Sequence, residues 1–461
     1  MKPLIPLAFI IFLIGCNLSC NNPIKKGEVE NLTMSSVISK SAPSFYIGVN
    51  EIKLPNPLPG LQSFVWGRLN NKIVLIGGRI EGFHGLTGRD SAFKSRLANT
   101  SVFVLDIATY SYKEMKMDAI DLSLQQFFST NMEFCQNGDS LFLVGGFGKI
   151  NTSDLRSNYT FNKMVTLSIS SLINQVEMSN GNIKKAILQT ASSPILQVTG
   201  GELYKKGNIF YLSFGQNFNQ IYSIGTTGIY TSSVKTFSVT NGIISDTASY
   251  VNSTMLHRRD LPVTEIITKD QVMLAAFGGV FSSTNDGYLN PVYVSMNGKS
   301  ISAIQDTMIQ KTNQYDCAMI SIFDVTSNSN TTVLLGGIGQ YQYHVSTGIW
   351  ENGDQGAKLP FVKTITQMIY QNGKMTQNIQ IPPKYPELPA LIGANAIFIP
   401  SVNLIYSNKT IDYSKITSDS TSIGLMYGGI LSQMPTSSEI YPTSLNTKLY
   451  QVYLVKNKSG K

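Results

Sequence analysis

The feature that most constrains this 461-residue chain is a repeated unit, in which a short apolar run ends in a pair of glycines. Five copies (KIVLIGG, SLFLVGG, VMLAAFGG, TTVLLGG and IGLMYGG) close at Gly78, Gly146, Gly279, Gly337 and Gly429. A sixth copy, NIFYLSFG, ends at Gly215 and has lost one glycine. Each copy is followed by a polar loop and a second run rich in β-branched and aromatic residues, which is typical of paired strands. One such unit alone would leave an apolar face uncovered, so the repetition predicts six stacked units.

The order of strand, double glycine, polar loop and second strand resembles the kelch family of β-propellers. The resemblance covers residues 44–455 and implies an all-β fold, a six-bladed kelch-like β-propeller with one repeat in each blade. Composition agrees, because 38 glycines and only 14% charged residues favour many short strands and tight turns over long helices. A seven-bladed ring and a β-sandwich are the alternatives that the pattern leaves open.

The two ends of the repeat region predict how the ring closes. The sixth repeat ends its third strand at Val455 and has almost no chain left for a fourth. Residues 44–55 are strand-like, so we expect this N-terminal strand to complete the last blade. The longest insertion, residues 407–422, also lies in the last repeat and has no apolar periodicity. It is a candidate contact surface if the protein is a structural component of a larger envelope assembly.

The first 16 residues, MKPLIPLAFIIFLIGC, have the pattern of a secretory signal, with one Lys, an apolar run and small residues before a Cys. Leu13-Ile14-Gly15-Cys16 resembles the bacterial lipobox, which implies lipidation at Cys16 and a membrane contact through the lipid anchor. A plain signal peptide cut nearby is the alternative. We expect a protein of the cell envelope, in the outer membrane because no Asp follows Cys16. Residues 17–43 are polar and predicted to form a flexible tether, and residues 456–461 a tail.

Several functional classes find no support in the sequence. The net charge of +8 comes from scattered Lys and Arg without basic runs, so we expect no nucleic-acid partner. No Cys/His spacing matches a metal site, and no phosphate-cradling loop or nucleophile turn is found, so no metal and no cofactor are predicted. Cys135 and Cys317 lie in separate repeats and are predicted to be free thiols. We expect a monomer.

The resemblance to kelch propellers implies a ligand face, formed by the loops between a blade's second and third strands and the loops between blades. The densest polar cluster expected there is His257, Arg258, Arg259 and Asp260. Two guanidinium groups can hold a carboxylate in bidentate fashion, with Asp260 orienting one of them. The alternative is that Asp260 and one Arg only pair to tie two blades together.

Two further groups fall on the same predicted face. The first group is Arg79, Glu81 and His84, in which the carboxylate of Glu81 and the imidazole of His84 can transfer protons. Tyr341 and Tyr343, beside His344, present rings that can stack on a sugar. Both groups are equally compatible with ordinary solvated loops.

These observations favour a binding module that holds a protein or glycan ligand on one face of the propeller. The alternative is an exported sugar mutarotase or epimerase-like enzyme acting on an acidic sugar, because the chain also resembles, more distantly, the kelch-type sialic acid mutarotases. That resemblance implies Arg258 and Arg259 for the carboxylate and Glu81 or His84 for proton transfer. No motif identifies a reaction, and a fold does not establish a function, so a non-enzymatic role is preferred.

Overall fold

The computed structural model describes residues 43–83, 92–151, 154, 157–222, 226–268, 271–282, 287–352, 359–436 and 442–457. The predicted signal peptide with Cys16, the tether up to residue 42 and the last four residues lie outside this range. His84 lies outside it as well. No helix among the described residues is long and apolar enough to cross a membrane.

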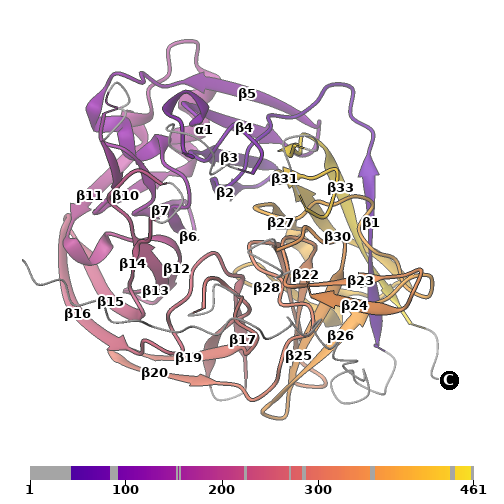
Figure 1. Ribbon diagram of the computed structural model, residues 1–461. Coiled ribbons are helices and arrows are strands. Elements are labelled where there is room, and N and C mark those ends of the chain that lie inside the picture. The colour runs from indigo at the N-terminus through magenta and orange to yellow at the C-terminus, as the bar shows by residue number, and fades with distance from the viewer. Residues whose placement is uncertain are drawn as a thin grey trace, which may run out of the picture. The chain divides into compact units, whose positions relative to one another are not determined.

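The described residues form six antiparallel sheets arranged around one axis, as Figure 1 shows in a view along that axis. Each sheet is a blade, numbered here in chain order. Their strands are β2 (Val65–Leu69), β3 (Lys72–Ile76), β4 (Ser101–Asp106) and β5 (Ser111–Lys116) in blade 1; β6 (Glu133–Asn137), β7 (Ser140–Val144), β10 (Lys163–Ser168) and β11 (Ile187–Ser192) in blade 2; β12 (Thr199–Lys206), β13 (Ile209–Asn217), β15 (Ser233–Thr240) and β16 (Ile243–Val251) in blade 3; β17 (Val263–Ile267), β18 (Val272–Ala276), β19 (Val292–Asn297) and β20 (Ser300–Gln305) in blade 4; β21 (Ala318–Asp324), β22 (Ser329–Leu335), β25 (Ile365–Gln371) and β26 (Lys374–Gln380) in blade 5; and β27 (Ile397–Pro400), β30 (Ser420–Tyr427), β33 (Leu449–Lys456) and β1 (Phe45–Ile52) in blade 6. The predicted six-bladed propeller is confirmed, and the seven-bladed and sandwich alternatives are wrong.

Short elements occupy the connections between these strands. Small hairpins or bridges are formed by β8 (Phe147–Lys149) with β9 (Asn158–Thr160), β14 (Ile229–Tyr230) with β13, β23 (Tyr341–His344) with β24 (Ile349–Asn352), and β31 (Ile430–Leu431) with β32 (Ser444–Leu445). The described 3-10 helices are Ser95–Leu97, Leu122–Phe128, Ile183–Ala186, Pro194–Leu196, Val402–Leu404 and Tyr413–Lys415. The α-helix α1 (Ile169–Glu177) leaves blade 2 and packs its buried residues against blades 1 and 2.

The N-terminal strand closes the ring, as predicted. β1 pairs antiparallel with β33 over its whole length, from Phe45 opposite Lys456 to Ile52 opposite Leu449. In Figure 1 the indigo β1 lies beside the yellow β33. The last blade therefore takes its outer strand from the other end of the chain.

The repeated glycines are explained by close approach of the next blade. Gly145 and Gly146 have φ of 63° and 87°, a conformation that side chains rarely adopt. A Cβ on Gly145 would lie 2.0 Å from the carbonyl oxygen of Val198, in the segment that leads into blade 3. In the degenerate sixth copy, Phe214 itself takes a positive φ of 62° before Gly215. The glycine pairs therefore mark the points where each blade meets the incoming chain of its neighbour.

The long insertion of the last repeat does not project from the ring. β28 (Ile405–Ser407) leads into it and pairs with β29 (Thr410–Asp412), which lies within it and pairs in parallel with β21 of blade 5. At the tip of this hairpin, the Lys409 ammonium lies 4.1 Å from the ring centroid of Trp66 in blade 1 and 5.1 Å from that of Phe134 in blade 2. The hairpin therefore reaches across the axis. We call it the axial plug (residues 405–412).

The axial plug also contacts blades 3 and 4. Asn408 donates a hydrogen bond to the carboxylate of Glu265, which also accepts one from the hydroxyl of Tyr204. Burial raises the pKa of Glu202 to about 7, although the nearby Lys409 opposes the shift. Tyr204 and Glu265 lie inside the first strands of blades 3 and 4, and none of residues 405–412 lines the cavity found at the starts of the first strands.

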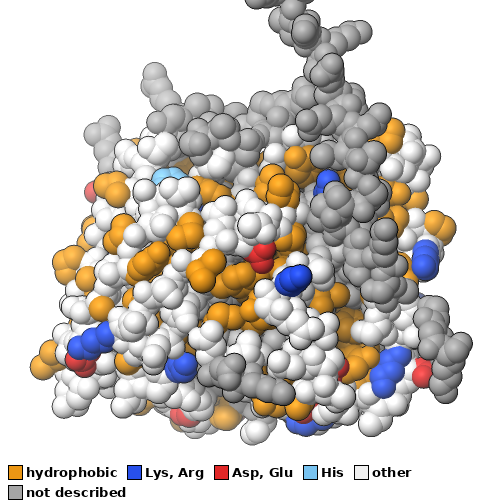
Figure 2. Space-filling model, turned by 90° about the horizontal axis from the view of Figure 1, so that it is seen from below, with side chains coloured by type: hydrophobic (Ala, Val, Ile, Leu, Met, Phe, Trp, Pro, Cys, Tyr) orange, Lys and Arg blue, Asp and Glu red, His pale blue; other side chains and the backbone are white. Residues whose placement is uncertain are grey.

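Charged side chains gather into no single patch on the side of the molecule that Figure 2 displays. Lys and Arg appear singly there, among apolar and uncharged side chains. Cys135 and Cys317, on blades 2 and 5, are both free, as predicted. Burial raises the pKa of the Cys135 thiol to about 12.

Candidate functional site

A cavity of about 370 Å³ opens where the first strands of the blades begin, at the axis of the ring. We call it the central cavity. Its walls come from the loops between the second and third strands of the blades and from the loops between blades. Its aromatic lining residues are Phe83, Phe93, Phe147, Phe218, Tyr222, Phe281, Tyr315 and Phe361. The cavity thus lies on the face that the kelch resemblance implied for ligands.

Four of these rings form a closed cluster on one side of the cavity. Phe93 lies 5.2 Å from Phe147 and 5.2 Å from Tyr222, measured between ring centroids. Phe218 completes the cluster, 5.4 Å from Phe147 and 5.2 Å from Tyr222. Because the rings come from blades 1, 2 and 3, the contacts hold three loops together. Edge-to-face packing of this kind fixes the rings and presents an apolar wall.

Six residues with the same backbone conformation, one from each blade, form the polar floor of the cavity. One residue of each blade, at or just before the start of its first strand, has a positive φ of 50° to 71°: Ser63, Asn131, Gly200, Asp260, Asp316 and Asn395. We call these residues the axial ring. Backbone hydrogen bonds join successive members, from the N–H of Asn131, Gly200, Asp260 and Asn395 to the carbonyls of Ser63, Asn131, Gly200 and Asp316. The ring brings one side chain or one glycine from every blade to the axis.

Side chains of the axial ring also contact one another. The hydroxyl of Ser63 donates to Oδ1 of Asn395 at 2.8 Å, and the amide of Asn131 donates to Oδ1 of Asp260 at 3.3 Å. A Cβ on Gly200 would lie 2.6 Å from that same Oδ1. Glycine at position 200 therefore leaves the space that the Asp260 carboxylate occupies.

Arg259 is held on the floor by groups of the protein itself. Its guanidinium pairs with the carboxylate of Asp260 and donates to the hydroxyls of Tyr230 at 3.2 Å and Tyr222 at 3.4 Å. It also lies 5.2 Å from the ring centroid of Phe281. Burial disfavours the charge, but Asp260 and the two tyrosines outweigh burial and raise the pKa of Arg259. The Arg259–Asp260 pair is therefore a neutral unit that is already satisfied.

Asp316 differs from Asp260 in its surroundings. Burial is the main cause that raises the pKa of Asp316 to about 8, and the neighbouring Asp260 adds to the shift while Arg259 opposes it. The side chain of Asn395 hydrogen-bonds to the Asp316 carboxyl. The raised pKa favours the protonated form of the Asp316 carboxyl at neutral pH.

Arg258, predicted to bind a ligand, is buried between blades and does not line the cavity. Its guanidinium donates to the carbonyls of Met255 at 2.9 Å, Gly278 at 3.1 Å and Asn290 at 2.8 Å. Burial lowers its pKa to about 10, and the group lies 4.4 Å from the ring centroid of Tyr288. These contacts are structural, so we leave Arg258 out of the candidate site.

His257 lies behind the floor of the cavity. Its ring stacks on Tyr230 with centroids 3.9 Å apart, and its Nδ1 is 3.3 Å from the hydroxyl of Ser232. Because Tyr230 bonds to Arg259, His257 supports the site without lining it. Burial lowers the pKa of His257, which favours the neutral ring.

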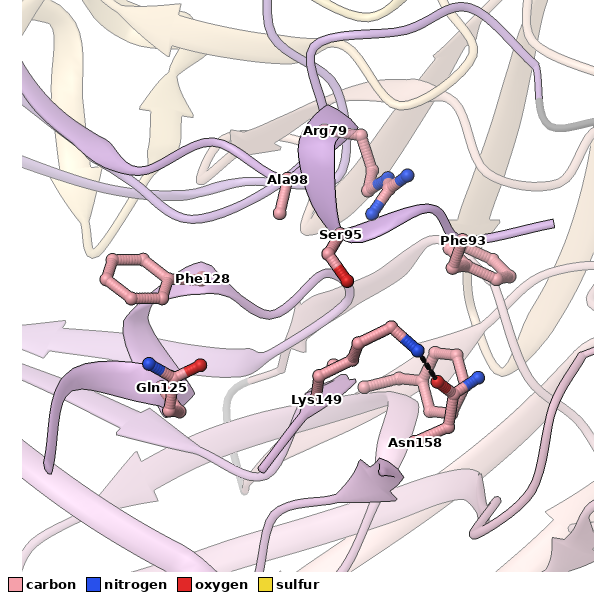
Figure 3. A pocket seen from close by; sticks show the side chains of 10 residues that line it. Arg79, Phe93, Ser95, Ala98, Gln125, Phe128, Lys149 and Asn158 are labelled. Carbon is pink, nitrogen blue, oxygen red and sulfur yellow. Dashed lines mark hydrogen bonds between the residues drawn. The ribbon is translucent and has the colours of Figure 1, made fainter. Parts of the chain in front are cut away.

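Arg79 and Glu81 pair with each other beside a second, much smaller cavity, which Figure 3 shows. The volume of this cavity is about 20 Å³, enough for one water molecule. Lys149 enters it from the neighbouring blade and bonds to Oδ1 of Asn158. The rings of Phe93 and Phe147 line both cavities. The Arg79 group therefore supports the aromatic wall from behind.

The predicted Tyr341, Tyr343 and His344 lie on the β23–β24 hairpin and not in the central cavity. Tyr343 packs on Trp350 with centroids 5.1 Å apart, and the His344 ring pairs with Glu351 at 2.6 Å. Of the predicted site residues that the structure describes, only Arg259 and Asp260 line the cavity. Sequence reasoning missed its aromatic wall and the polar residues Asn131, Asp316 and Asn395. Among the described residues, no group of three or more His, Cys, Asp or Glu is placed to hold a metal ion.

Comparison with known proteins adds little to this description. No family model and no curated protein matches the chain. A solved structure titled "Structure of YjhT" is similar with a TM-score of 0.47 and 12% sequence identity, over 85% of this chain and 99% of that chain. At this level the likeness is one of fold alone, and the propeller is established by the strand pairing within the chain itself.

Proposed function

We propose that the protein binds a sugar in the central cavity. The observation that carries the proposal is a wall of aromatic rings facing a polar floor at the axis. Sugar rings have apolar C–H faces that stack on aromatic side chains and hydroxyl groups that bond to amides, hydroxyls and carboxylates. The cavity volume of about 370 Å³ is also within the range of roughly 300–1,000 Å³ that small-molecule sites occupy. A glycan therefore fits this site better than a flat protein surface does.

A thermal-shift screen against neutral, amino and acidic sugars tests this proposal. A sugar present at a hundred times its Kd is expected to stabilise the fold by about 2.7 kcal/mol. Phe83 lines the cavity although 44% of it is exposed, so Phe83→Ala is expected to weaken binding by roughly tenfold with little loss of stability. Ile304→Ala, at a 67% exposed residue on blade 4, is the matched control and should bind normally. If no sugar shifts the melting temperature, the proposal fails.

A second candidate is proton-transfer chemistry on the bound sugar, as in a mutarotase or epimerase. The observation that favours it is the pair of axial-ring carboxyl groups in different states, Asp316 protonated when the cavity is empty and Asp260 paired with Arg259. An acidic substrate is not favoured, because Arg258 is buried and Arg259 is already paired. Anomer exchange of the bound sugar, followed by NMR, distinguishes catalysis from binding alone.

We also propose that the blades are kelch repeats and that the protein is a monomeric lipoprotein of the outer membrane, anchored through Cys16. The support is the apolar run that precedes Leu13-Ile14-Gly15-Cys16. Cys16→Ser is expected to abolish incorporation of an alkynyl fatty acid in cells and to move the protein out of the membrane fraction. Cys20→Ser is the control and should remain labelled. Unchanged labelling of the Cys16 variant would contradict the anchor.

A further inference from the structure

The ionisable side chains that line the central cavity are not equally paired. Among its described lining residues, only Arg259, Asp260 and Asp316 carry strongly acidic or basic side chains. Arg259 and Asp260 neutralise each other, and the remaining donors of Arg259 reach the hydroxyls of Tyr230 and Tyr222. No described Lys, Arg or His forms an ion pair with Asp316. The floor of the cavity therefore has one carboxyl group without an ion pair in the described part of the chain, and Arg259 offsets its charge only in part.

We infer that the ligand of the central cavity carries a positively charged nitrogen, and that this group lies against the carboxylate of Asp316. The inference rests on the proposed sugar-binding function and names the class of sugar, an amino sugar with a free amine. The polar ring and the aromatic wall contact the sugar body, while Asp316 selects the amine. Asp316 is thus the residue that determines specificity.

The aromatic rings favour the same class of ligand. The face of a Phe or Tyr ring attracts a cation, and the attraction is largest where water is excluded. Tyr315 precedes Asp316 and also lines the cavity, and the cluster of four rings lines another side of the same cavity. A carboxylate among aromatic rings is a favourable environment for an organic ammonium group. A sugar acid finds no unpaired cation among the described lining residues, because Arg259 is paired with Asp260.

Binding of a cation at Asp316 must be linked to a proton. Burial and the neighbouring Asp260 raise the pKa of Asp316 to about 8, and Arg259 only partly offsets them, so the protonated carboxyl is favoured below this pH. A bound cation favours the ionised form, so binding in this range releases a proton. The affinity for a ligand of fixed charge should therefore rise with pH, by at most roughly tenfold per unit, and level off above about pH 8.

The test compares four probes on the full chain by titration calorimetry: glucose, glucosamine, glucuronate and tetramethylammonium. Glucosamine is expected to bind at least about tenfold more tightly than glucose, and glucuronate to bind weakest of the sugars. Tetramethylammonium carries a charge that does not titrate, so its affinity should show the rise between pH 6 and 8. The heat in buffers of different ionisation enthalpy reports the proton that is released.

Asp316→Asn is the decisive variant. Position 316 has a φ of 50°, which Asn tolerates well, so the backbone is expected to be retained. The variant should bind glucosamine and glucose equally, keep its affinity for glucose within about threefold, and lose the pH dependence. Glu351→Gln removes the same charge from the exposed β23–β24 hairpin and should leave every affinity unchanged.

The outcomes separate this inference from the proposed function. If glucose and glucosamine bind equally to the natural chain, or if glucuronate binds most tightly, the inference is overturned while sugar binding stands. If tetramethylammonium binds through Asp316 and no sugar does, the cation site at Asp316 stands, while the sugar proposal and the assignment of an amino sugar fail. If no probe binds, both fail.

Discussion

Replacing Arg258 with methionine is expected to lower the free energy of unfolding by about 3–5 kcal/mol, because a buried hydrogen-bonded charge is removed from its partners. Only 1% of Arg258 is exposed, and its guanidinium bonds to three carbonyls from separate segments. One of these is Gly278, in the double glycine of blade 4, and another is Asn290, just before β19. Methionine fills much of the volume but donates no hydrogen bond. Urea denaturation at pH 7 measures the loss.

Arg96→Met is the matched control, because Arg96 is an exposed arginine on a short 3-10 helix. The same substitution there is expected to change stability by no more than about 0.5 kcal/mol. A result in which Arg258→Met keeps its stability but loses ligand would return Arg258 to the binding site. The experiment therefore decides between the structural role shown by its contacts and the role predicted from the sequence.

The contrast between Arg258 and Arg259 shows why the site was only partly predictable. The two residues are adjacent and have the same side chain, so the sequence gives no way to predict which of them lines the cavity. The structure separates them: Arg259 lines the cavity, whereas Arg258 is buried against the carbonyls of Met255, Gly278 and Asn290. Two of these carbonyls belong to segments further along the chain, so a single stretch of sequence does not specify the difference.

The architecture was predictable because its causes are local and repeated. Each double glycine follows from a close backbone approach that recurs in blade after blade, as at Gly145 beside Val198. Ring closure was predictable because the last repeat lacks a fourth strand and one strand-like segment precedes the first repeat. The same logic, applied to the start of each first strand, would have aligned Asp316 with Asp260 and identified the axial ring.

The aromatic wall had no comparable signal. Phe93 comes from a loop of blade 1 and Tyr222 from a loop of blade 3, yet their ring centroids are 5.2 Å apart. Loops of different length and sequence carry these residues, so no repeat position relates them. Conversely, the sequence predicted a sugar site at Tyr341, Tyr343 and His344. These residues form the first strand of a separate hairpin, and they contact Trp350 and Glu351 of its second strand.

Closure of the ring depends on one strand from the distant end of the chain. In β1, Ile47 is fully buried in a cluster that joins blades 5 and 6. Gln380 of blade 5 binds the backbone of Ile47 on both sides, accepting from its N–H at 2.6 Å and donating to its carbonyl at 3.0 Å. Gln367 likewise donates to the carbonyl of Phe45 at 2.9 Å. These amides fix β1 to blade 5 while its own ladder fixes it to β33.

Ile47→Asp is therefore expected to cost more than about 4 kcal/mol and to leave much of the chain unfolded, because it places an unpaired carboxylate in a fully buried apolar site. Gly48→Ala tests the neighbouring position, where a Cβ would meet no atom within 4 Å, and it should change stability by less than about 0.5 kcal/mol. Urea denaturation and resistance to protease report both variants. If Ile47→Asp melts like the natural chain, the other five blades hold the ring without the N-terminal strand. If it unfolds cooperatively at low urea while Gly48→Ala does not, the contact between the two chain ends is what makes the six blades one folding unit.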